Sequence, residues 1–318
     1  MIEVENLSKK YANHLAINDV SFNVPKGEIL GFLGPNGAGK STTMRIITGF
    51  LSPTSGKVRV GGLDIMDKYL EARKKIGYLP ERPPLYPDMT VISYLDFVGK
   101  IKGLKNKNQR KKRLEEILEI CWIKDVKDKL ISKLSKGYQQ RVGLAQAIIH
   151  DPEVIILDEP TIGLDPKQIN ETRKLIKSLG GKHTIILSTH ILPEVSMTCD
   201  RVLIINKGKV VVEDTPEGLV SQLKGSERIH IQVRGPSDEI KTKIQSIEGI
   251  IKVSVDKNKG NEEINSYTIE SIKGKDLREK IATTIVNNNW GLLELKPIGV
   301  SLEDVFLHVI TQEEEVAA

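Results

Sequence analysis

The sequence predicts an α/β protein whose main domain holds a mostly parallel β-sheet, followed by a small α+β domain. Apolar runs of strand length alternate with helical patterns along the first part of the chain, which is typical of a parallel sheet covered by helices. The strands expected in this sheet are Ile29–Leu33, Val154–Leu157, Thr184–Ser188 and Val202–Ile205. Beyond about Lys224 the chain turns polar and strand-rich. We therefore expect a first domain at residues 1–224 and a second at residues 225–318.

A phosphate loop follows the first of these strands. The sequence G-P-N-G-A-G-K-S at Gly34–Ser41 matches the pattern G-x-x-x-x-G-K-[ST]. Glycines let the backbone fold around an anion, so that its N–H groups and the start of the next helix, expected at Thr42–Thr48, point at phosphates. The sequence therefore predicts that the chain binds a nucleoside triphosphate. The residues expected to hold it are Gly34, Pro35, Asn36, Gly37, Ala38, Gly39, Lys40, Ser41 and Thr42.

Two carboxylates end the strand Val154–Leu157. At the carboxyl edge of a parallel sheet, Asp158 would lie near the phosphate loop and hold Mg²⁺ through water, while Ser41 would offer its hydroxyl to the ion. Glu159, one residue on, would face the terminal phosphate as a candidate general base. The alternative is a solvated Asp-Glu turn without chemistry, which the preceding phosphate loop disfavours.

A Ser/Gly turn at Leu134–Gly137 runs directly into an amphipathic helix. This segment resembles the L-S-G-G-Q signature of the nucleotide-binding subunits of ATP-binding-cassette (ABC) transporters, with Lys136 in place of the first glycine and Tyr138 in place of the glutamine. The helix start, with a free Ser135 hydroxyl and the Gly137 amide, suits an anion. The resemblance implies that it binds the terminal phosphate held by a second copy of the chain, in a head-to-tail homodimer with two shared sites.

Other residues match the family in the same order along the chain. The resemblance implies that Tyr11 stacks on adenine, that Asp165 crosses the dimer interface within the loop Gly163–Pro166, and that His190 contacts the terminal phosphate. Each would be unremarkable alone, because a strand Tyr, a turn Asp and a lone His are more often structural.

Glu81 is the clearest departure from the family pattern. Most members have Gln at this place, after the expected strand that ends in Tyr78-Leu79. Both side chains present an oxygen to Mg²⁺ or its water, but Glu81 adds negative charge and has no amide N–H. We expect a functional metal contact with altered coupling.

The resemblance also implies the architecture and the partner. The expected fold is the ABC cassette of phosphate-loop NTPases, with a mostly parallel sheet, an antiparallel β region built from short strands in Met1–Lys57, and a helical subdomain at about residues 82–150. In the family the surface of that subdomain receives a separate transmembrane permease subunit. The chain itself has no apolar stretch of the ~18 residues that a membrane span needs, so we expect it at the cytoplasmic, inner face of the cell membrane.

Composition excludes some partners and constrains the compartment. The net charge of +5 is spread among acidic residues, and only 4% of residues are aromatic, so no nucleic acid is expected to bind. The densest basic run, Lys100–Arg113, is expected to be an exposed helical segment. The two cysteines form no metal or redox motif, which favours a reducing compartment.

The second domain has a strand-helix-strand-strand-helix-strand pattern, which predicts a ferredoxin-like fold. A last helix is expected at Leu302–Ile310, and the segment Val300–Leu307 resembles the end of ATPase subunits in the ABC exporter subgroup of drug-resistance and gliding-motility systems. Fold alone assigns no activity. Stabilising the dimer and sensing a ligand are both open roles for this domain.

We therefore predict the ATPase subunit of an ABC exporter, with Glu159, His190 and Lys40 as catalytic residues and ATP and Mg²⁺ as ligands. One alternative is a soluble ABC ATPase of DNA repair or translation, but this chain lacks the long coiled coil, zinc cysteines or second cassette expected there. Another is a nucleotide-regulated binding module without turnover, which Glu159 and His190 disfavour.

Overall fold

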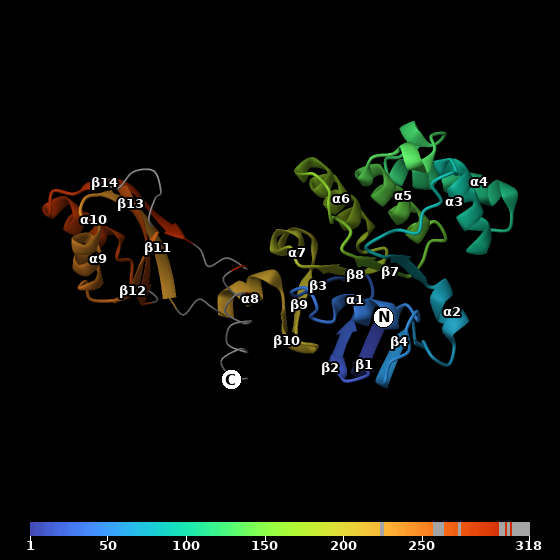
Figure 1. Ribbon diagram of the computed structural model, residues 1–318, viewed down its shortest axis with the longest axis horizontal. Coiled ribbons are helices and arrows are strands. Elements are labelled where there is room, and N and C mark those ends of the chain that lie inside the picture. Colours follow the sequence, from blue (N-terminus) through green and yellow to red (C-terminus); the bar gives the residue numbers. More distant parts are fainter. Residues whose placement is uncertain (223–225, 257–263, 273–274, 299–302, 304–305, 307–318) are drawn as a thin grey trace. The chain divides into compact units, whose positions relative to one another are not determined.

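The computed structural model describes the chain except for residues 223–225, 257–263, 273–274, 299–302, 304–305 and 307–318 (Figure 1). It divides into two compact units, Met1–Pro216 and Glu217–Ala318, which we call the first unit and the second unit. The short helix α8 (Pro216–Gln222) begins at the boundary, directly after Thr215, as its Thr-Pro-Glu start predicts.

The first unit, all of whose residues are described, is built on a six-stranded sheet in the order β10-β9-β3-β8-β7-β6. The members are β3 (Ile29–Leu33), β6 (Ile76–Leu79), β7 (Val154–Asp158), β8 (Thr184–Thr189), β9 (Arg201–Asn206) and β10 (Lys209–Asp214). Every pairing is parallel except that of β10 with β9. The predicted parallel sheet is confirmed, and its central strands are buried along their whole length because helices and a second sheet cover both faces.

Helices of the first unit connect these strands. They are α1 (Lys40–Ile47), α2 (Tyr69–Lys74), α3 (Val91–Ile101), α4 (Lys107–Ile120), α5 (Lys136–Ile148), α6 (Pro166–Leu179) and α7 (Leu192–Thr198), with 3₁₀ turns at Lys124–Val126 and Ile131–Lys133. In Figure 1, α5 and α6 lie above the six-stranded sheet, whereas α1 lies below it. Helices α3, α4 and α5 pack on one another within residues 82–150, where the sequence predicted a helical subdomain.

A second, antiparallel sheet of the first unit has the order β2-β1-β4-β5. Its strands are β1 (Ile2–Tyr11), β2 (His14–Val24), β4 (Ser55–Val60) and β5 (Leu63–Asp64). The prediction of short strands was wrong for β1 and β2, which run ten and eleven residues. The strands are irregular at Asn6 and Asp19. Both residues take a positive φ, at 48° and 55°, where the pairing register shifts, so the sequence there lacks the regular alternation of apolar and polar residues. Their side chains are joined by a 2.9 Å hydrogen bond from Asn6 Nδ2 to Asp19 Oδ1, so the strands continue through the irregularity.

The basic run Lys100–Arg113 differs in part from the exposed helical segment that was predicted. Helix α3 ends at Ile101 and α4 starts at Lys107, because Asn106 caps α4 by accepting hydrogen bonds from two backbone N–H groups. Arg110 is buried, and its Nε donates to Asp96 Oδ1 at 2.5 Å. The run is therefore broken in the middle, and one of its charges is part of the packing between α3 and α4.

Within its described residues the second unit has four antiparallel strands in the order β12-β13-β11-β14, with two helices. The elements are β11 (Ser226–Arg234), α9 (Ser237–Gln245), β12 (Ile250–Asp256), β13 (Ile264–Ile272), α10 (Arg278–Asn287) and β14 (Gly291–Ile298). The order of elements along the chain agrees with the predicted pattern. Apart from Glu303 and Phe306, the helix predicted at Leu302–Ile310 lies outside the described residues.

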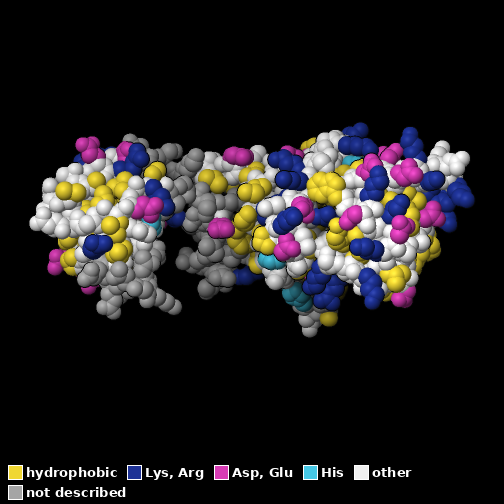
Figure 2. All heavy atoms as spheres, turned by 90° about the horizontal axis from the view of Figure 1, so that it is seen from above, with side chains coloured by type: hydrophobic (Ala, Val, Ile, Leu, Met, Phe, Trp, Pro, Cys, Tyr) yellow, Lys and Arg dark blue, Asp and Glu magenta, His cyan; other side chains and the backbone are white. Residues whose placement is uncertain are grey.

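The surface carries mixed charge. Figure 2 shows Lys and Arg side chains interspersed with Asp and Glu over the visible face of the first unit. None of the helices that the structure describes has the length and apolar character of a membrane span.

Candidate nucleotide site

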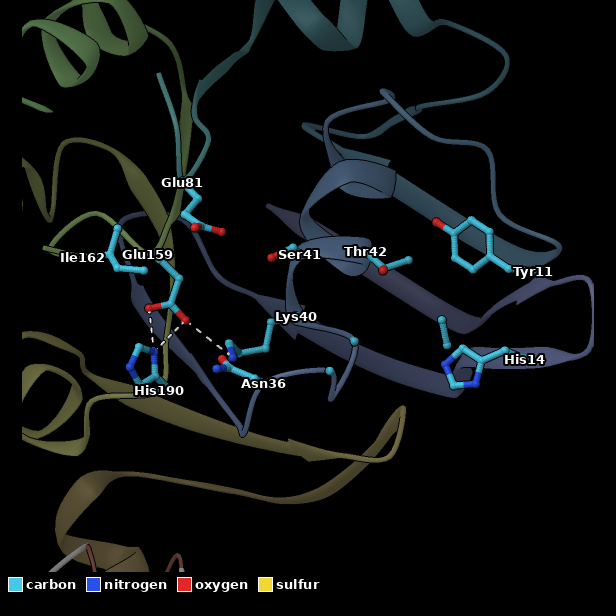
Figure 3. A pocket seen from close by; sticks show the side chains of 13 residues that line it. Tyr11, His14, Asn36, Lys40, Ser41, Thr42, Glu81, Glu159, Ile162 and His190 are labelled. Carbon is cyan, nitrogen blue, oxygen red and sulfur yellow. Dashed lines mark hydrogen bonds and ion pairs between the residues drawn. The ribbon is translucent and has the colours of Figure 1, made fainter. Parts of the chain in front are cut away.

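A pocket of about 530 Å³ opens at the carboxyl edge of the six-stranded sheet (Figure 3). The loop between β3 and α1 forms one wall, and the residues after β7 and β8 form another, because parallel strands all end at the same edge. The lining residues are Tyr11, His14, Ala16, Asn36, Gly37, Gly39, Lys40, Ser41, Thr42, Glu81, Glu159, Ile162 and His190.

The phosphate loop is closed by Lys40. This buried side chain donates from Nζ to the carbonyl oxygen of Gly34 at 2.8 Å and to that of Pro35 at 3.2 Å. Gly39 has φ of 106°, and a Cβ there would lie 2.7 Å from the carbonyl oxygen of Ala16, so the turn requires glycine. Helix α1 starts at Lys40, not at Thr42 as predicted. The first N–H groups of the helix therefore belong to the loop itself, which is the arrangement that suits an anion.

Ser41 and Asp158 lie together, as predicted. Ser41 Oγ donates to Asp158 Oδ1 at 3.1 Å, and Ser188 Oγ donates to the same oxygen at 2.5 Å. Asp158 is almost completely buried beneath the pocket floor. Figure 3 shows the Glu81 carboxylate pointing into the pocket from the opposite wall. Hydroxyl and carboxylate oxygens are the donors that Mg²⁺ prefers, so this set fits that ion.

Glu159 lies at the centre of the charged groups. Its carboxylate is 2.9 and 3.1 Å from His190 Nδ1 and 3.5 Å from Lys40 Nζ, as the dashed lines in Figure 3 mark. The backbone takes φ of 50°, a left-handed conformation that is uncommon outside glycine, and the N–H donates to the Ser188 carbonyl at 3.1 Å. Strained positions of this kind cluster at functional sites. The sequence predicted the three charged residues, but not that one carboxylate joins the other two.

Tyr11 ends β1 at the far end of the pocket and is 44% exposed, which leaves its ring free to contact a ligand. Lys9 Nζ lies 5.3 Å from the ring centroid. Sequence reasoning missed His14 and Ala16, which line the pocket beside Tyr11. His14 pairs with Tyr11 across the turn between β1 and β2, so recognising a hairpin there would have found it. Ile162, the third lining residue that was missed, carries no motif signal.

Ser135, Gly137 and Asp165 do not line this pocket. Ser135 caps α5 and Asp165 caps α6, with their side-chain oxygens accepting from backbone N–H groups three residues on at 3.5 and 2.9 Å. The Ser135 oxygen accepts this hydrogen bond as a helix N-cap, and its O–H can still donate to another group. A Cβ on Gly137 would lie 2.5 Å from the side chain of Gln168 on α6. The two helix N-termini are therefore neighbours.

Both residues that depart from the signature pattern have structural contacts. Tyr138 donates from its hydroxyl to Asp125 Oδ2 at 2.7 Å, and the Arg141 guanidinium lies 5.5 Å from its ring centroid. Lys136 extends toward Gly163, where a Cβ would be 3.4 Å from its Nζ. Tyr138 therefore anchors the start of α5, while Lys136 places a cation beside the loop that leads to α6.

Comparison with known proteins places this geometry in a family. The family model described as ABC transporter matches residues 17–162. The linearmycin resistance ATP-binding protein LnrL of Bacillus subtilis (strain 168) is 35% identical over 311 residues, 97% of this chain and 98% of that protein. The bacitracin transport ATP-binding protein BcrA of Bacillus licheniformis is 40% identical over 215 residues, 67% of this chain and 69% of that protein.

Solved structures agree. The dimeric structure of a post-hydrolysis state of the ATP-binding cassette MJ0796 bound to ADP and Pi matches with a TM-score of 0.62 and 28% identity, over 68% of this chain and 98% of that one. The phosphate loop, the acidic strand end and the family relatives lead to one assignment. The chain belongs to the ABC transporter family, as an ATP-binding subunit.

Proposed function

We propose that this chain hydrolyses ATP in the pocket at the sheet edge and, as a homodimer, drives a separate membrane subunit that exports a substrate. The observation that carries the hydrolytic part is the Glu159 carboxylate, held against both Lys40 and His190 in the pocket that the phosphate loop forms. A carboxylate so placed beside a phosphate site can orient and deprotonate water.

The lining residues favour one orientation of ATP in the pocket. Tyr11 at its far end presents an aromatic face for adenine, and the amides of the phosphate loop and of the start of α1 lie between Tyr11 and Glu159 for the phosphates (Figure 3). Lys40 holds loop carbonyls and Glu159, and phosphate oxygens would be stronger acceptors for its charge. Asn36 and Thr42 line the same stretch and would donate to phosphate oxygens.

Ser41 and Glu81 would hold Mg²⁺ together with phosphate oxygens and water, and Asp158 would act on the metal through water. Among the described residues no cluster of three His, Cys, Asp or Glu side chains could hold a metal alone. Mg²⁺ usually keeps several waters and binds one or two carboxylates plus substrate phosphates, which agrees with this sparse set. Bound there, the ion would neutralise negative charge on the phosphates.

Hydrolysis then follows from the positions of Glu159 and His190. Glu159 takes a proton from water as the water oxygen attacks the γ-phosphorus, while the bond from that phosphorus to the bridging oxygen breaks and leaves ADP and phosphate. His190 contacts the Glu159 carboxylate through Nδ1, which fixes its direction. In its protonated form the His190 ring has a donor on both nitrogens, so Nε2 would donate to the terminal phosphate, in keeping with 41% exposure of the side chain.

The homodimer is proposed from the residues outside the pocket. Ser135 and Asp165 cap two neighbouring helices, α5 and α6, and Gly137 packs between them. Adjacent helix N-termini favour an anion, and Lys136 adds positive charge beside them. A second copy in head-to-tail orientation would present its ATP to this surface, and its γ-phosphate would join the two chains. A solved relative that holds ADP and Pi is dimeric, which supports this reading.

Export is proposed from the names of relatives, which include linearmycin resistance and bacitracin transport ATP-binding proteins. The helical subdomain would receive the membrane subunit, and the chain would act at the cytoplasmic face of the membrane. For the second unit we propose a ferredoxin-like accessory domain, supported by the strand order β12-β13-β11-β14 with two helices.

The test compares wild-type protein with Glu159→Gln. Phosphate release is followed in parallel with ATP-dependent dimerisation by light scattering. We expect the variant to lose turnover by about 10²-fold or more and to accumulate a dimer with ATP, because binding is kept while proton removal is lost. Glu119→Gln, at an exposed surface ion pair with Lys124, is the matched control and should behave as wild type. A monomeric Glu159→Gln protein that hydrolyses ATP at the wild-type rate would refute the proposal.

A further inference from the structure

Glu194 is a buried carboxylate that the proposed chemistry does not use. It lies on α7 and is 1% exposed. Burying an ionisable group without hydrogen bonds is costly. Glu194 accepts two hydrogen bonds, one on each carboxylate oxygen. Thr161 Oγ1 donates to Oε1, and Thr189 Oγ1 donates to Oε2 at 2.8 Å. Both threonines are themselves buried, so water is not an alternative partner at this point.

The two threonines belong to the two loops that carry the reacting groups. Thr161 is two residues after Glu159, in a turn closed by the Ile162 N–H donating to the Glu159 carbonyl at 3.2 Å. Thr189 immediately precedes His190. Its Oγ1 also accepts from the Ile191 N–H at 3.0 Å, so the hydroxyl links the backbone after His190 to Glu194. One carboxylate therefore ties down both loops from beneath the pocket.

We propose that Glu194 is a positioning residue for ATP hydrolysis, which holds Glu159 and His190 in register through the Thr161 and Thr189 hydroxyls. The inference rests on the proposed hydrolytic function. The contact between Glu159 and His190 spans two loops that are otherwise joined by the pairing of β7 with β8, the Glu159 N–H to Ser188 bonds and the bond from Ser188 Oγ to Asp158. A shift of either loop by about 1 Å can cost up to about 10²-fold in rate, so a common anchor matters to the chemistry.

A role in packing alone predicts something different. If Glu194 and its partners only fill space, the methyl groups of the threonines matter and their hydroxyls do not. Valine keeps the shape and removes the hydroxyl, whereas serine keeps the hydroxyl and removes the methyl group. Thr161 and Thr189 can therefore each be tested in two opposite ways.

The experiment measures steady-state phosphate release by the full chain, and separately the affinity for a fluorescent ATP analogue. We expect Thr161→Val, Thr189→Val and Glu194→Gln to lower kcat about 10-fold or more, with nucleotide affinity within about twofold of wild type. Thr161→Ser and Thr189→Ser should keep the wild-type kcat. Thr198→Val is the matched control. It lies on the same helix and is buried, and its hydroxyl has no hydrogen-bond partner among the described residues.

Two results would overturn the inference: valine variants with wild-type kcat, or serine variants that lose as much kcat as the valine variants. Melting temperatures of all variants show whether a loss of kcat reflects unfolding. If it does, the control Thr198→Val should lose kcat as well. Failure of the proposed function looks different. In that case wild-type protein releases no phosphate, or Glu159→Gln keeps the wild-type rate, whereas an inactive Glu159→Gln beside active valine variants refutes only the role of Glu194.

Discussion

The two units use β-sheets of similar size in opposite ways. In the first unit, parallel strands bring Asp158, Glu159 and His190 to one edge beside the phosphate loop. In the second unit, side chains alternate along the antiparallel strands, so that Ile229 and Ile231 face the core while Arg228 and His230 face outward. The parallel sheet therefore gathers charged groups at one end, whereas the antiparallel sheet spreads its charged groups along one face.

On that outward face polar side chains pair across strands. Arg228 lies 3.0 Å from Glu270 on the neighbouring strand, and the His230 ring lies 3.5 Å from Glu294. Cross-strand pairs of this kind contribute tenths of a kcal/mol each. In the first unit the buried Lys40 and Glu159 also pair, at 3.5 Å, but both side chains line a pocket. The comparison teaches that ion pairs along an outer face contribute to stability alone, whereas a pair that lines a pocket can also contact a ligand.

The largest expected effect tests whether the chemistry is confined to the first unit. Lys40→Ala should lower phosphate release by about 10³-fold, because a charge that stabilises the transferring phosphate is lost. The unfolding midpoint of the second unit, followed by Trp290 fluorescence in a Trp122→Phe background, should not change. Lys182→Ala, at an exposed ion pair with Asp151, is the control. A Lys40→Ala protein with wild-type turnover would contradict the assignment of the chemistry to the first unit.

The reverse experiment places a cavity in the second unit. Ile231 is completely buried in a core with Tyr267 and Ile269, so Ile231→Ala should lower the free energy of unfolding of that unit by about 2–5 kcal/mol. Urea unfolding followed by Trp290 fluorescence measures it, and Ile251→Ala, at a side chain 53% exposed, is the control. The basal ATP turnover should stay unchanged. A parallel loss of turnover would show that the units are not separate in function.

A partly buried histidine of the first unit, His150, sharpens the contrast with the paired side chains of the second. Burial, with Lys102 nearby, lowers the pKa of His150 to about 4. The folded chain therefore keeps it neutral, whereas the unfolded chain binds a proton below about pH 6.5. Stability should fall as the pH drops below that value, by about 2 kcal/mol at pH 5 from this residue. Urea midpoints from Trp122 fluorescence at pH 7.5 and 5 measure it. His150→Gln should remove this part of the loss, and an equal pH dependence in both proteins would contradict the assignment.

The smallest effect concerns Glu81, which lines the pocket and has no hydrogen-bond or ion-pair partner among the described residues. Glu81→Gln removes one negative charge from the expected metal site, so the Mg²⁺ concentration for half-maximal turnover should rise by about threefold, since ligand charge tunes affinity. Glu71→Gln on α2, away from the pocket, is the control. If neither the Mg²⁺ dependence nor stimulation by a membrane partner changes, Glu81 is only a loop residue.

Residues within motifs were predictable because their spacing fixes their place. The phosphate loop needs a strand before it and a helix after it, and an apolar run that ends in carboxylates needs a sheet edge. Lys40, Ser41 and Asp158 accordingly lie as the sequence predicted. The elements of the second unit were also predictable, because their apolar alternation matches strand and helix periods.

Other features depend on contacts across the fold, which local patterns do not encode. The contact of Glu159 with both His190 and Lys40 follows from the strand order, which places β8 between β3 and β7. The positive φ of Glu159 arises where the chain leaves that sheet. Ile162 lines the pocket although no motif indicates it. The N-cap at Asn106 is a local signal, and it interrupts the helical segment predicted for the basic run.

The central claim is that each ATP site combines the phosphate loop of one chain with α5 of another. Mixing two inactive variants tests it most directly: Lys40→Ala, which damages the loop, and Gly137→Asp, which places a side chain against Gln168 and a negative charge at the helix start. Random pairing makes half of the dimers mixed, each with one intact site, so phosphate release should recover to roughly a quarter of the wild-type rate. A mixture as inactive as its components, in proteins that still dimerise, would contradict the shared site.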